Sequence, residues 1–213
     1  MAPLRQRRQA RQCPISALFA GGRRIHTAPT GSHVLPGALP ATTLVLGGAR
    51  SGKSAHAEAL VLASGLRPVY VATAEPLDGE MTERVRRHRE RRADAWRTVE
   101  EPLALPEILA DLADPGRAIL VDCLTLWVTN LLLAQRSVAE AGDRLLAVLG
   151  RRRGAVVLVS NEVGQGIVPM GELTRAFVDE AGRLHQKIAA EADLVRLIVA
   201  GLPLDLKTPA PGP

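Results

Sequence analysis

Short apolar runs alternate with longer segments of mixed polarity between residues 42 and 207. The runs at 42–46, 68–74, 118–122 and 155–160 are rich in aliphatic residues and are bounded by Gly, Pro or polar residues. Runs of this length are typical of buried strands. A shorter strand is expected at 96–100. The segment 194–206 is expected to end the fold as strand, with Gly201 and Pro203 indicating a hairpin or a bulge.

The segments between these runs have helical spacing, and Pro102 is expected to begin one of the helices. In another, Met81, Val85 and His88 fall on one face. Strands that alternate with helices predict an α/β fold, a mostly parallel sheet with helices on both faces. Ligands bind such sheets at the carboxyl ends of the strands. The helices are expected at 54–63, 79–92, 102–112, 124–133, 138–149 and 171–192.

The junction after the first strand carries the most specific motif, G-x-x-x-x-G-K-S. Its glycines let the backbone turn tightly and approach a polyphosphate, and the N–H groups at the helix start form an anion cradle. A lysine at this position reaches the β- and γ-phosphates, and the following serine places a hydroxyl on Mg²⁺. A glycine-rich turn with a chance lysine is the alternative, but the flanking strand and helix favour the phosphate-binding loop of P-loop NTPases. The residues are Gly47, Gly48, Ala49, Arg50, Ser51, Gly52, Lys53 and Ser54.

Charge divides the chain into two parts. Residues 1–41 hold six arginines and no acidic residue, so the 27 basic and 22 acidic residues of the whole chain leave 21 basic and 22 acidic residues in the rest. We therefore expect a disordered Arg-rich extension at 1–41 and one domain at 42–213. A near-neutral domain with only 2% aromatic residues argues against nucleic-acid binding. The chain contains no run of 18 apolar residues, so no membrane span is predicted. Its two cysteines show no disulfide pattern, which favours a location in the cytoplasm.

Three further positions bear candidate chemistry. Asp122 ends a buried strand, where a carboxylate can hold Mg²⁺ or cap the next helix. His88 lies among arginines, which would keep its imidazole neutral and could bind phosphates, so it is either a nucleophile toward an α-phosphate or a packing residue on a solvated face. Glu100 could hold Mg²⁺ or a ribose hydroxyl, or could be solvated with its neighbour Glu101. His56 and His185 are expected to be ordinary helix residues.

Together these motifs resemble one family, the bifunctional adenosylcobinamide kinase / adenosylcobinamide-phosphate guanylyltransferase, over about 42–207. The motifs that carry the resemblance, in chain order, are Gly47–Ser54; Val71–Ala74; Glu80 and Met81 with Arg84, Val85, His88 and Arg89; Trp96–Pro102; Val121–Thr125 with Thr129–Leu131; and Ser160–Gly164 with Gly166–Pro169.

The resemblance implies a RecA-like fold, a homo-oligomer (a trimer) and two reactions. ATP or GTP phosphorylates adenosylcobinamide, and GMP then passes from GTP through a guanylyl-histidine to adenosylcobinamide phosphate, giving adenosylcobinamide-GDP. It implies Lys53 and His88 as catalytic residues, and Mg²⁺ on Ser54 and Asp122. The nucleotide contacts it implies are the whole loop Gly47–Ser54, with Ala72, Thr73, Ala74, Arg89, Glu90, Arg91, Arg92, Glu100 and Asp122.

Two other functions remain open on the sequence alone. A P-loop kinase of another small molecule would need the loop and no covalent intermediate. A non-catalytic module that binds nucleotide as a switch would need neither reaction. His88 and the Asn161–Gly164 loop favour the corrinoid enzyme over both.

Overall fold

The structure is a computed structural model that describes residues 39–74 and 95–209, and the statements below concern those residues. The Arg-rich extension expected at 1–41, except for residues 39–41, and the helix expected at 79–92 lie outside them. Within the described residues the sheet has seven strands in the order β3-β2-β4-β5-β1-β6-β7. Only β7 is antiparallel to its neighbour. The elements are β1 (Thr42–Gly47), α1 (Lys53–Ala63), β2 (Arg67–Ala72), β3 (Arg97–Glu100), α3 (Leu105–Leu112), β4 (Arg117–Asp122), α4 (Leu124–Leu133), α5 (Val138–Arg151), β5 (Ala155–Asn161), α6 (Glu172–Glu191), β6 (Leu194–Val199) and β7 (Leu202–Lys207).

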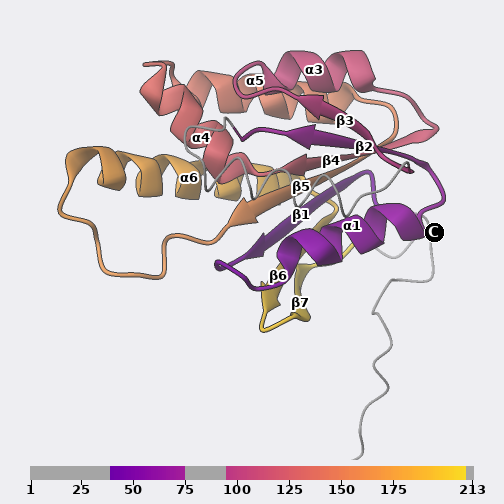
Figure 1. Ribbon diagram of the computed structural model, residues 1–213. Helices are drawn as coiled ribbons and strands as arrows, with labels where there is room; N and C mark the ends of the chain where they lie inside the picture. Colours follow the sequence, from indigo (N-terminus) through magenta and orange to yellow (C-terminus); the bar gives the residue numbers. More distant parts are fainter. Residues whose placement is uncertain (1–38, 75–94, 210–213) are drawn as a thin grey trace, which may run out of the picture. The chain divides into compact units, whose positions relative to one another are not determined.

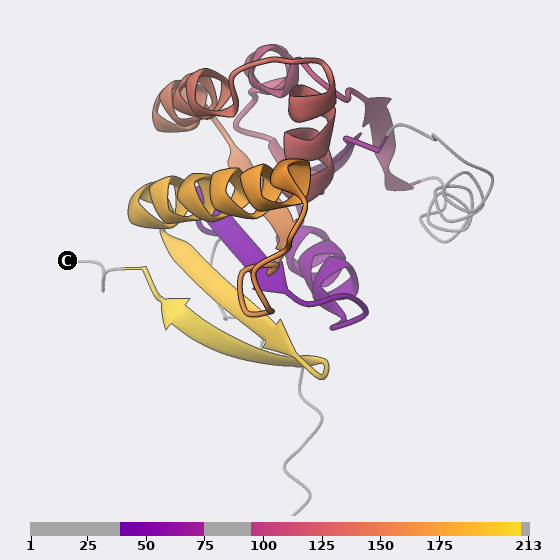
Figure 2. The ribbon, with the colours of Figure 1, turned by 90° about the vertical axis from the view of Figure 1, so that its left-hand side faces the viewer.

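Helices cover both faces of this sheet, as the alternation of elements predicts. Helix α1 lies on one face, and α3, α4, α5 and α6 lie on the other (Figures 1 and 2). Side chains alternate between the two faces along each strand. In β4, for example, Leu120 packs in the cluster beneath α1, whereas Ile119 and Val121 pack in the larger cluster on the opposite face.

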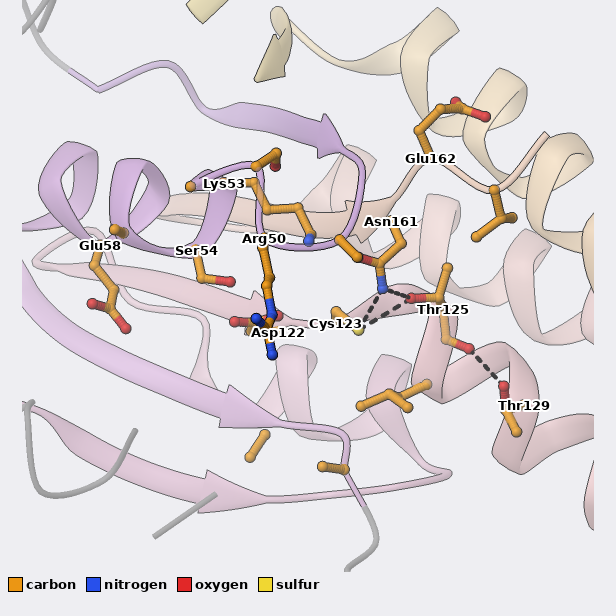
Figure 3. Close-up of a pocket in the computed structure, with 18 of the residues that line it drawn as sticks. Arg50, Lys53, Ser54, Glu58, Asp122, Cys123, Thr125, Thr129, Asn161 and Glu162 are labelled. Carbon is orange, nitrogen blue, oxygen red and sulfur yellow. Dashed lines mark hydrogen bonds between the residues drawn. The ribbon is translucent and has the colours of Figure 1, made fainter. Parts of the chain in front are cut away.

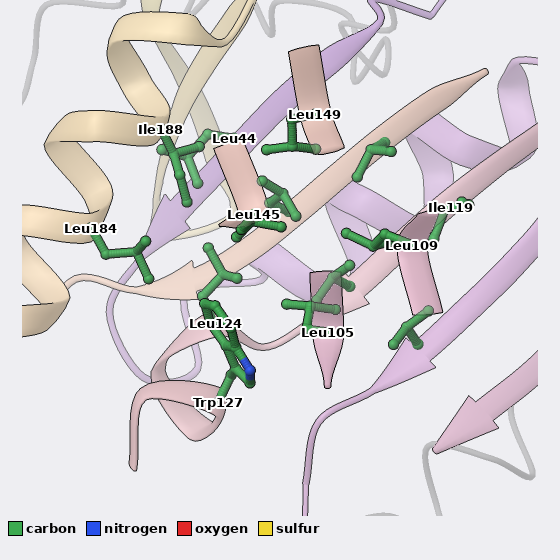
Figure 4. Packing of buried hydrophobic residues seen from close by; sticks show 14 of the residues in the cluster. Leu44, Leu105, Leu109, Ile119, Leu124, Trp127, Leu145, Leu149, Leu184 and Ile188 are labelled. Atoms are coloured by element: carbon green, nitrogen blue, oxygen red, sulfur yellow. The ribbon is translucent and has the colours of Figure 1, made fainter. Parts of the chain in front are cut away.

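The larger cluster is the main hydrophobic core. Leu105 and Leu109 of α3, Trp127 of α4 and Leu145 of α5 converge on the sheet, each at most 1% exposed (Figure 4). Burying one such side chain contributes about 1.5–3 kcal/mol. The core therefore fixes the strand order, and with it the edge at which the strands end.

That strand order places β5 between β1, which leads into the glycine-rich loop, and β4, which ends in Asp122. It is the arrangement of the RecA-like P-loop NTPase fold, as the resemblance implies. Because β1, β2, β4 and β5 are parallel, their carboxyl ends meet at one edge. None of the helices in the described part of the chain is both long and apolar enough to cross a membrane.

Several expected boundaries differ from the observed ones, and two of these differences concern the site and the turn before α3. Strand β2 ends at Ala72 rather than residue 74, and Thr73 and Ala74 leave the sheet. Helix α3 begins at Leu105 rather than residue 102. Oε1 of Glu101 accepts hydrogen bonds from the backbone N–H groups at 103 and 104, which closes a turn before the helix, and Pro106 instead occupies its first turn. The expected hairpin is confirmed as β6 and β7, with a register shift between Val195 and Arg196.

Candidate active site

The glycine-rich loop joins β1 to α1 and holds Lys53 inward. Lys53 is 8% exposed, and its Nζ donates to the Gly48 carbonyl at 3.2 Å. Gly52, which precedes the helix, has φ 94°, a left-handed conformation that favours glycine. A Cβ on Gly47 would lie 2.5 Å from Ser51 Oγ and 2.7 Å from a backbone oxygen of β6. The motif's glycines at 47 and 52 are therefore required by the local geometry.

The turn between β6 and β7 contacts the glycine-rich loop at Ser51 and Gly52. The backbone N–H of Gly201 donates to the Ser51 carbonyl at 2.9 Å, and the Gly201 Cα would lie 3.4 Å from a Cβ built on Gly52. On the other side, the backbone N–H of Glu162 donates to the Gly47 carbonyl at 3.0 Å. The loop is thus held by two segments that are distant in sequence.

A cavity of about 850 Å³ opens above the loop at the carboxyl edge of the sheet. Figure 3 shows Ser54, Glu58 and Asp122 on one side of Lys53, and Asn161, Thr125 and Thr129 on the other. We call the first side the carboxylate arm, made of Glu58, Tyr70, Thr98, Glu100 and Asp122, and the second side the threonine arm, made of Thr125, Thr129, Asn161, Glu162 and Phe177.

The carboxylate arm is organised around Asp122. Tyr70 donates its hydroxyl to Asp122 Oδ2 at 3.0 Å, and its ring meets Trp96 edge-on with centroids 6.1 Å apart. Strand register places Thr98 opposite Tyr70 and Glu100 opposite Ala72, so these side chains share the face covered by α1. Hard oxygen donors therefore gather within one arm, next to the loop.

The threonine arm is held by hydrogen bonds among its own members. Asn161 Nδ2 donates to Thr125 Oγ1 at 2.8 Å, and Thr129 Oγ1 donates to the Thr125 carbonyl at 3.0 Å. Glu162 Oε1 accepts from the backbone N–H of Gly164 at 2.7 Å. Cys123 also lines the cavity, and burial together with nearby Asp122 raises the pKa of its thiol to about 11. The thiol is therefore protonated near neutral pH.

Most of the residues predicted for the site lie around this cavity. The predicted residues that line it are Ala49, Arg50, Ser51, Gly52, Lys53, Ser54, Ala72, Ala74, Glu100 and Asp122. Gly47, Gly48 and Thr73 do not line it. Thr73 is fully buried, and its hydroxyl donates to the Cys123 carbonyl at 2.7 Å and accepts from the Cys123 N–H at 2.9 Å, which ties the end of β2 to that of β4. His88, Arg89, Glu90, Arg91 and Arg92 lie outside the described residues.

The sequence-based prediction assigned neither Tyr70 nor any member of the threonine arm to the site. Tyr70 lies inside a buried strand and has no local signal of function. Thr125 and Thr129 did carry a signal, because their spacing of four residues places both on one face of α4. Asn161, at the carboxyl end of β5, could also have been assigned by that position.

The two helix histidines are more than surface residues. His185 on α6 lies 2.6 Å from Ser160 Oγ through its Nε2, and burial lowers its pKa. His56 on α1 faces Arg196, whose Nη1 lies 3.0 Å from the His56 Nε2. Because arginine only donates, that nitrogen must be the acceptor of a neutral imidazole. Burial, and then the charge of Arg196, lower the pKa of His56.

A strand–loop–helix with a buried lysine, in a cavity shared with a carboxylate at the end of β4, the next strand but one, defines a P-loop nucleotide-binding protein. The comparisons with known proteins are more specific. Residues 43–206 match the family described as "Cobinamide kinase / cobinamide phosphate guanyltransferase", and the chain belongs to that family.

Three relatives support this assignment. The "Bifunctional adenosylcobalamin biosynthesis protein CobP" of Pseudomonas aeruginosa is 56% identical over 166 residues, which cover 77% of this chain and 96% of the relative. The proteins named "Bifunctional adenosylcobalamin biosynthesis protein CobU" in Salmonella typhimurium and Escherichia coli are 44% and 41% identical, each over 77% of this chain and 98% of the relative.

Proposed function

We propose that this protein phosphorylates adenosylcobinamide with ATP or GTP and then transfers GMP from GTP to adenosylcobinamide phosphate, giving adenosylcobinamide-GDP. The observation that carries the proposal is the convergence of Lys53, Ser54 and Asp122 on one cavity in a chain of this family. The loop accounts for nucleotide binding, and membership of the family indicates cobinamide as the acceptor of the phosphoryl group.

In the kinase step, the acceptor hydroxyl oxygen attacks the γ-phosphorus, and the bond from that phosphorus to the β–γ bridging oxygen breaks. The nucleoside diphosphate leaves, and the hydroxyl proton passes to solvent. Lys53 and the loop N–H groups stabilise the charge on the phosphate oxygens. Their contribution is positioning and electrostatics, as expected for phosphoryl transfer.

A Mg²⁺ ion fits the donors present beside the loop. Ser54 offers a hydroxyl and Asp122 a carboxylate that Tyr70 orients through Oδ2, and both are hard oxygen ligands of the kind Mg²⁺ prefers. When bound, the ion neutralises charge on the β- and γ-phosphate oxygens. In the described part of the chain no cluster of three or more His, Cys, Asp or Glu residues forms a metal site. Ser54 and Asp122 would therefore hold the ion together with oxygen ligands that the protein does not supply.

In the transferase step, an imidazole nitrogen of His88 attacks the α-phosphorus of GTP, and the bond to the α–β bridging oxygen breaks, releasing pyrophosphate. A phosphate oxygen of adenosylcobinamide phosphate then attacks the same phosphorus, the P–N bond breaks, and His88 is regenerated. This transferase step is supported by the resemblance and by the arginines near His88, among them Arg89, Arg91 and Arg92 within the next four residues.

Two further proposals follow, the first from the family resemblance and the second from the two cysteines without a disulfide pattern. We expect the enzyme to act as a homo-oligomer, a trimer. We expect it to work in the cytoplasm, where the buried thiol of Cys123 stays reduced.

The test is the intact mass of the protein after incubation with GTP and Mg²⁺ without corrinoid. We expect a GMP adduct in the wild type and in His26→Ala, a control histidine far from the motif in sequence, and no adduct in His88→Ala. His88→Ala should retain kinase activity, and Lys53→Ala should lose it. An adduct that persists in His88→Ala would assign the nucleophile elsewhere. A folded wild type that binds GTP without any adduct would leave a small-molecule kinase without a covalent intermediate.

A further inference from the structure

The two arms of the cavity lie on opposite faces of the sheet. The carboxylate arm lies on the face covered by α1, because Tyr70 and Ala72 belong to the core cluster beneath that helix. The threonine arm is built by Thr125 and Thr129 of α4 and by the end of β5 (Figure 3). Phe177 of α6 also belongs to it. Lys53 lies between them. A reaction that needs its attacking and leaving oxygens roughly in line requires an approach to the loop from two sides.

The threonine arm continues outward into an apolar groove. A second cavity of about 190 Å³ is lined by Thr129, Leu132, Leu133, Leu173, Thr174 and Phe177, which we call the α4–α6 groove. Thr129 and Phe177 line both cavities, so the groove is continuous with the site. Thr125, Thr129 and Leu133 are spaced by four residues along α4, which turns one helix face from polar at the loop to apolar outside.

The groove's outer wall is exposed to a degree unusual for leucine. Leu133 is 56% exposed and Leu173 is 58% exposed. At the inner end of the groove, Thr129 Oγ1 donates its hydrogen bond to the Thr125 carbonyl. The lone pairs of this oxygen can therefore accept a hydrogen bond from an amide N–H of a ligand. The groove is therefore graded from polar acceptors near the loop to apolar contacts at the surface.

We propose that the α4–α6 groove binds the macrocycle of the corrinoid acceptor, whose hydroxyl-bearing arm passes Thr129 to reach Lys53. This inference rests on the proposed function. A corrinoid combines a broad apolar ring with amide-linked polar arms, which matches the gradient of the groove. The ring lies against Leu133 and Leu173 rather than inside the small cavity, and the threonine arm hydrogen-bonds the linker.

A second copy of the chain is the other occupant that an exposed apolar groove suggests. Continuity with the catalytic cavity favours the substrate. The groove itself is small, with a volume of about 190 Å³, whereas a stable interface buries about 800 Å² on each partner.

The test compares Leu133→Gln and the double variant Leu133→Gln/Leu173→Gln with Leu206→Gln. Leu206 lies on β7 and is also 56% exposed, so it matches Leu133 in exposure without touching the groove. We expect the KM for cobinamide to rise about tenfold or more in the double variant, as loss of two apolar contacts implies. The KM for ATP, the mass in solution and all values for Leu206→Gln should stay at wild-type levels.

Three results would overturn the assignment, and they are distinguishable. An unchanged cobinamide KM in a folded double variant would remove the groove from acceptor binding. A fall in oligomeric mass with an unchanged cobinamide KM would make the groove a contact between copies. Separate calorimetric titrations of the wild type with cobinamide and with a non-hydrolysable ATP analogue test the proposed function on which this inference rests. Nucleotide binding without corrinoid binding would refute the proposed function itself, and the groove with it.

Discussion

Two ion pairs in this molecule have the same shortest N···O distance, 2.5 Å, and differ in burial. In the pair of Arg196 on β6 with Asp205 on β7, the side chains are 1% and 31% exposed. In the pair of Lys187 with Asp143, they are 44% and 64% exposed. Asp205→Ala leaves a buried guanidinium that cannot deprotonate, whereas Asp143→Ala leaves a hydrated ammonium.

The expected costs follow from that difference. Removing one partner of a buried pair costs about 3–5 kcal/mol, and the partial exposure of Asp205 places this case at the lower end, about 3 kcal/mol. Removing one partner of the exposed pair should cost under about 1 kcal/mol. If burial of the partner decides the cost, replacing both members together, as Arg196→Met/Asp205→Leu, should recover most of the stability that Asp205→Ala loses.

Urea unfolding at one fixed protein concentration measures both costs. With a slope of about 2 kcal/mol per molar urea, the midpoint should fall by about 1.5 M in Asp205→Ala and by less than about 0.5 M in Asp143→Ala. Equal shifts in the two variants would show that burial of the partner does not set the cost. The reasoning would also fail if the double variant were no more stable than Asp205→Ala.

Three further outcomes are expected. In Gly47→Ala the new Cβ would lie 2.5 Å from a side-chain oxygen, so the free energy of unfolding should fall by about 1–3 kcal/mol. In Gly48→Ala no atom lies within 4 Å of the new Cβ, so the same urea assay should show a change of at most about 0.5 kcal/mol. Burial lowers the pKa of His185 below 6.5, so at mildly acidic pH the unfolded chain binds a proton that the folded protein does not. The free energy of unfolding should therefore fall as the pH drops below about 6.5, by up to about 1.4 kcal/mol per pH unit for this group. Between pH 7.5 and pH 5.5, His185→Gln should lose less stability than the wild type. Because the thiol pKa of Cys123 is raised to about 11, Ellman's reagent at pH 8 should label a Cys13→Ser protein only as it unfolds, and fast labelling of the native protein would contradict its burial.

Local patterns were sufficient to predict the fold class and several residues that line the cavity of the candidate site. The apolar runs predicted β1, β2, β4 and β5, because burial on both faces leaves a continuous apolar stretch. The loop motif predicted Lys53 and Ser54, since its chemistry depends on spacing within a few residues. Asp122 could be assigned because a polar residue at the end of a buried strand is uncommon in a structural core.

Helix boundaries were less predictable. Pro102 suggested that helix α3 would begin at residue 102, but it begins at Leu105. The side chain of Glu101 accepts hydrogen bonds from two backbone N–H groups and holds the intervening residues in a turn. Such side-chain hydrogen bonds compete with helix formation and leave little trace in apolar periodicity.

The sequence by itself therefore determined the α/β class, the phosphate-binding loop and the position of Asp122 at a strand end. Only the tertiary structure decided which other side chains join them. Tyr70 reaches Asp122 across 52 residues and Asn161 reaches Thr125 across 36, because β2, β4 and β5 are neighbours in the sheet. Strand order depends on how helices pack over both faces, and no local pattern records it. The turn at Gly201 supports the loop for the same reason, since β6 lies beside β1 only in the folded sheet.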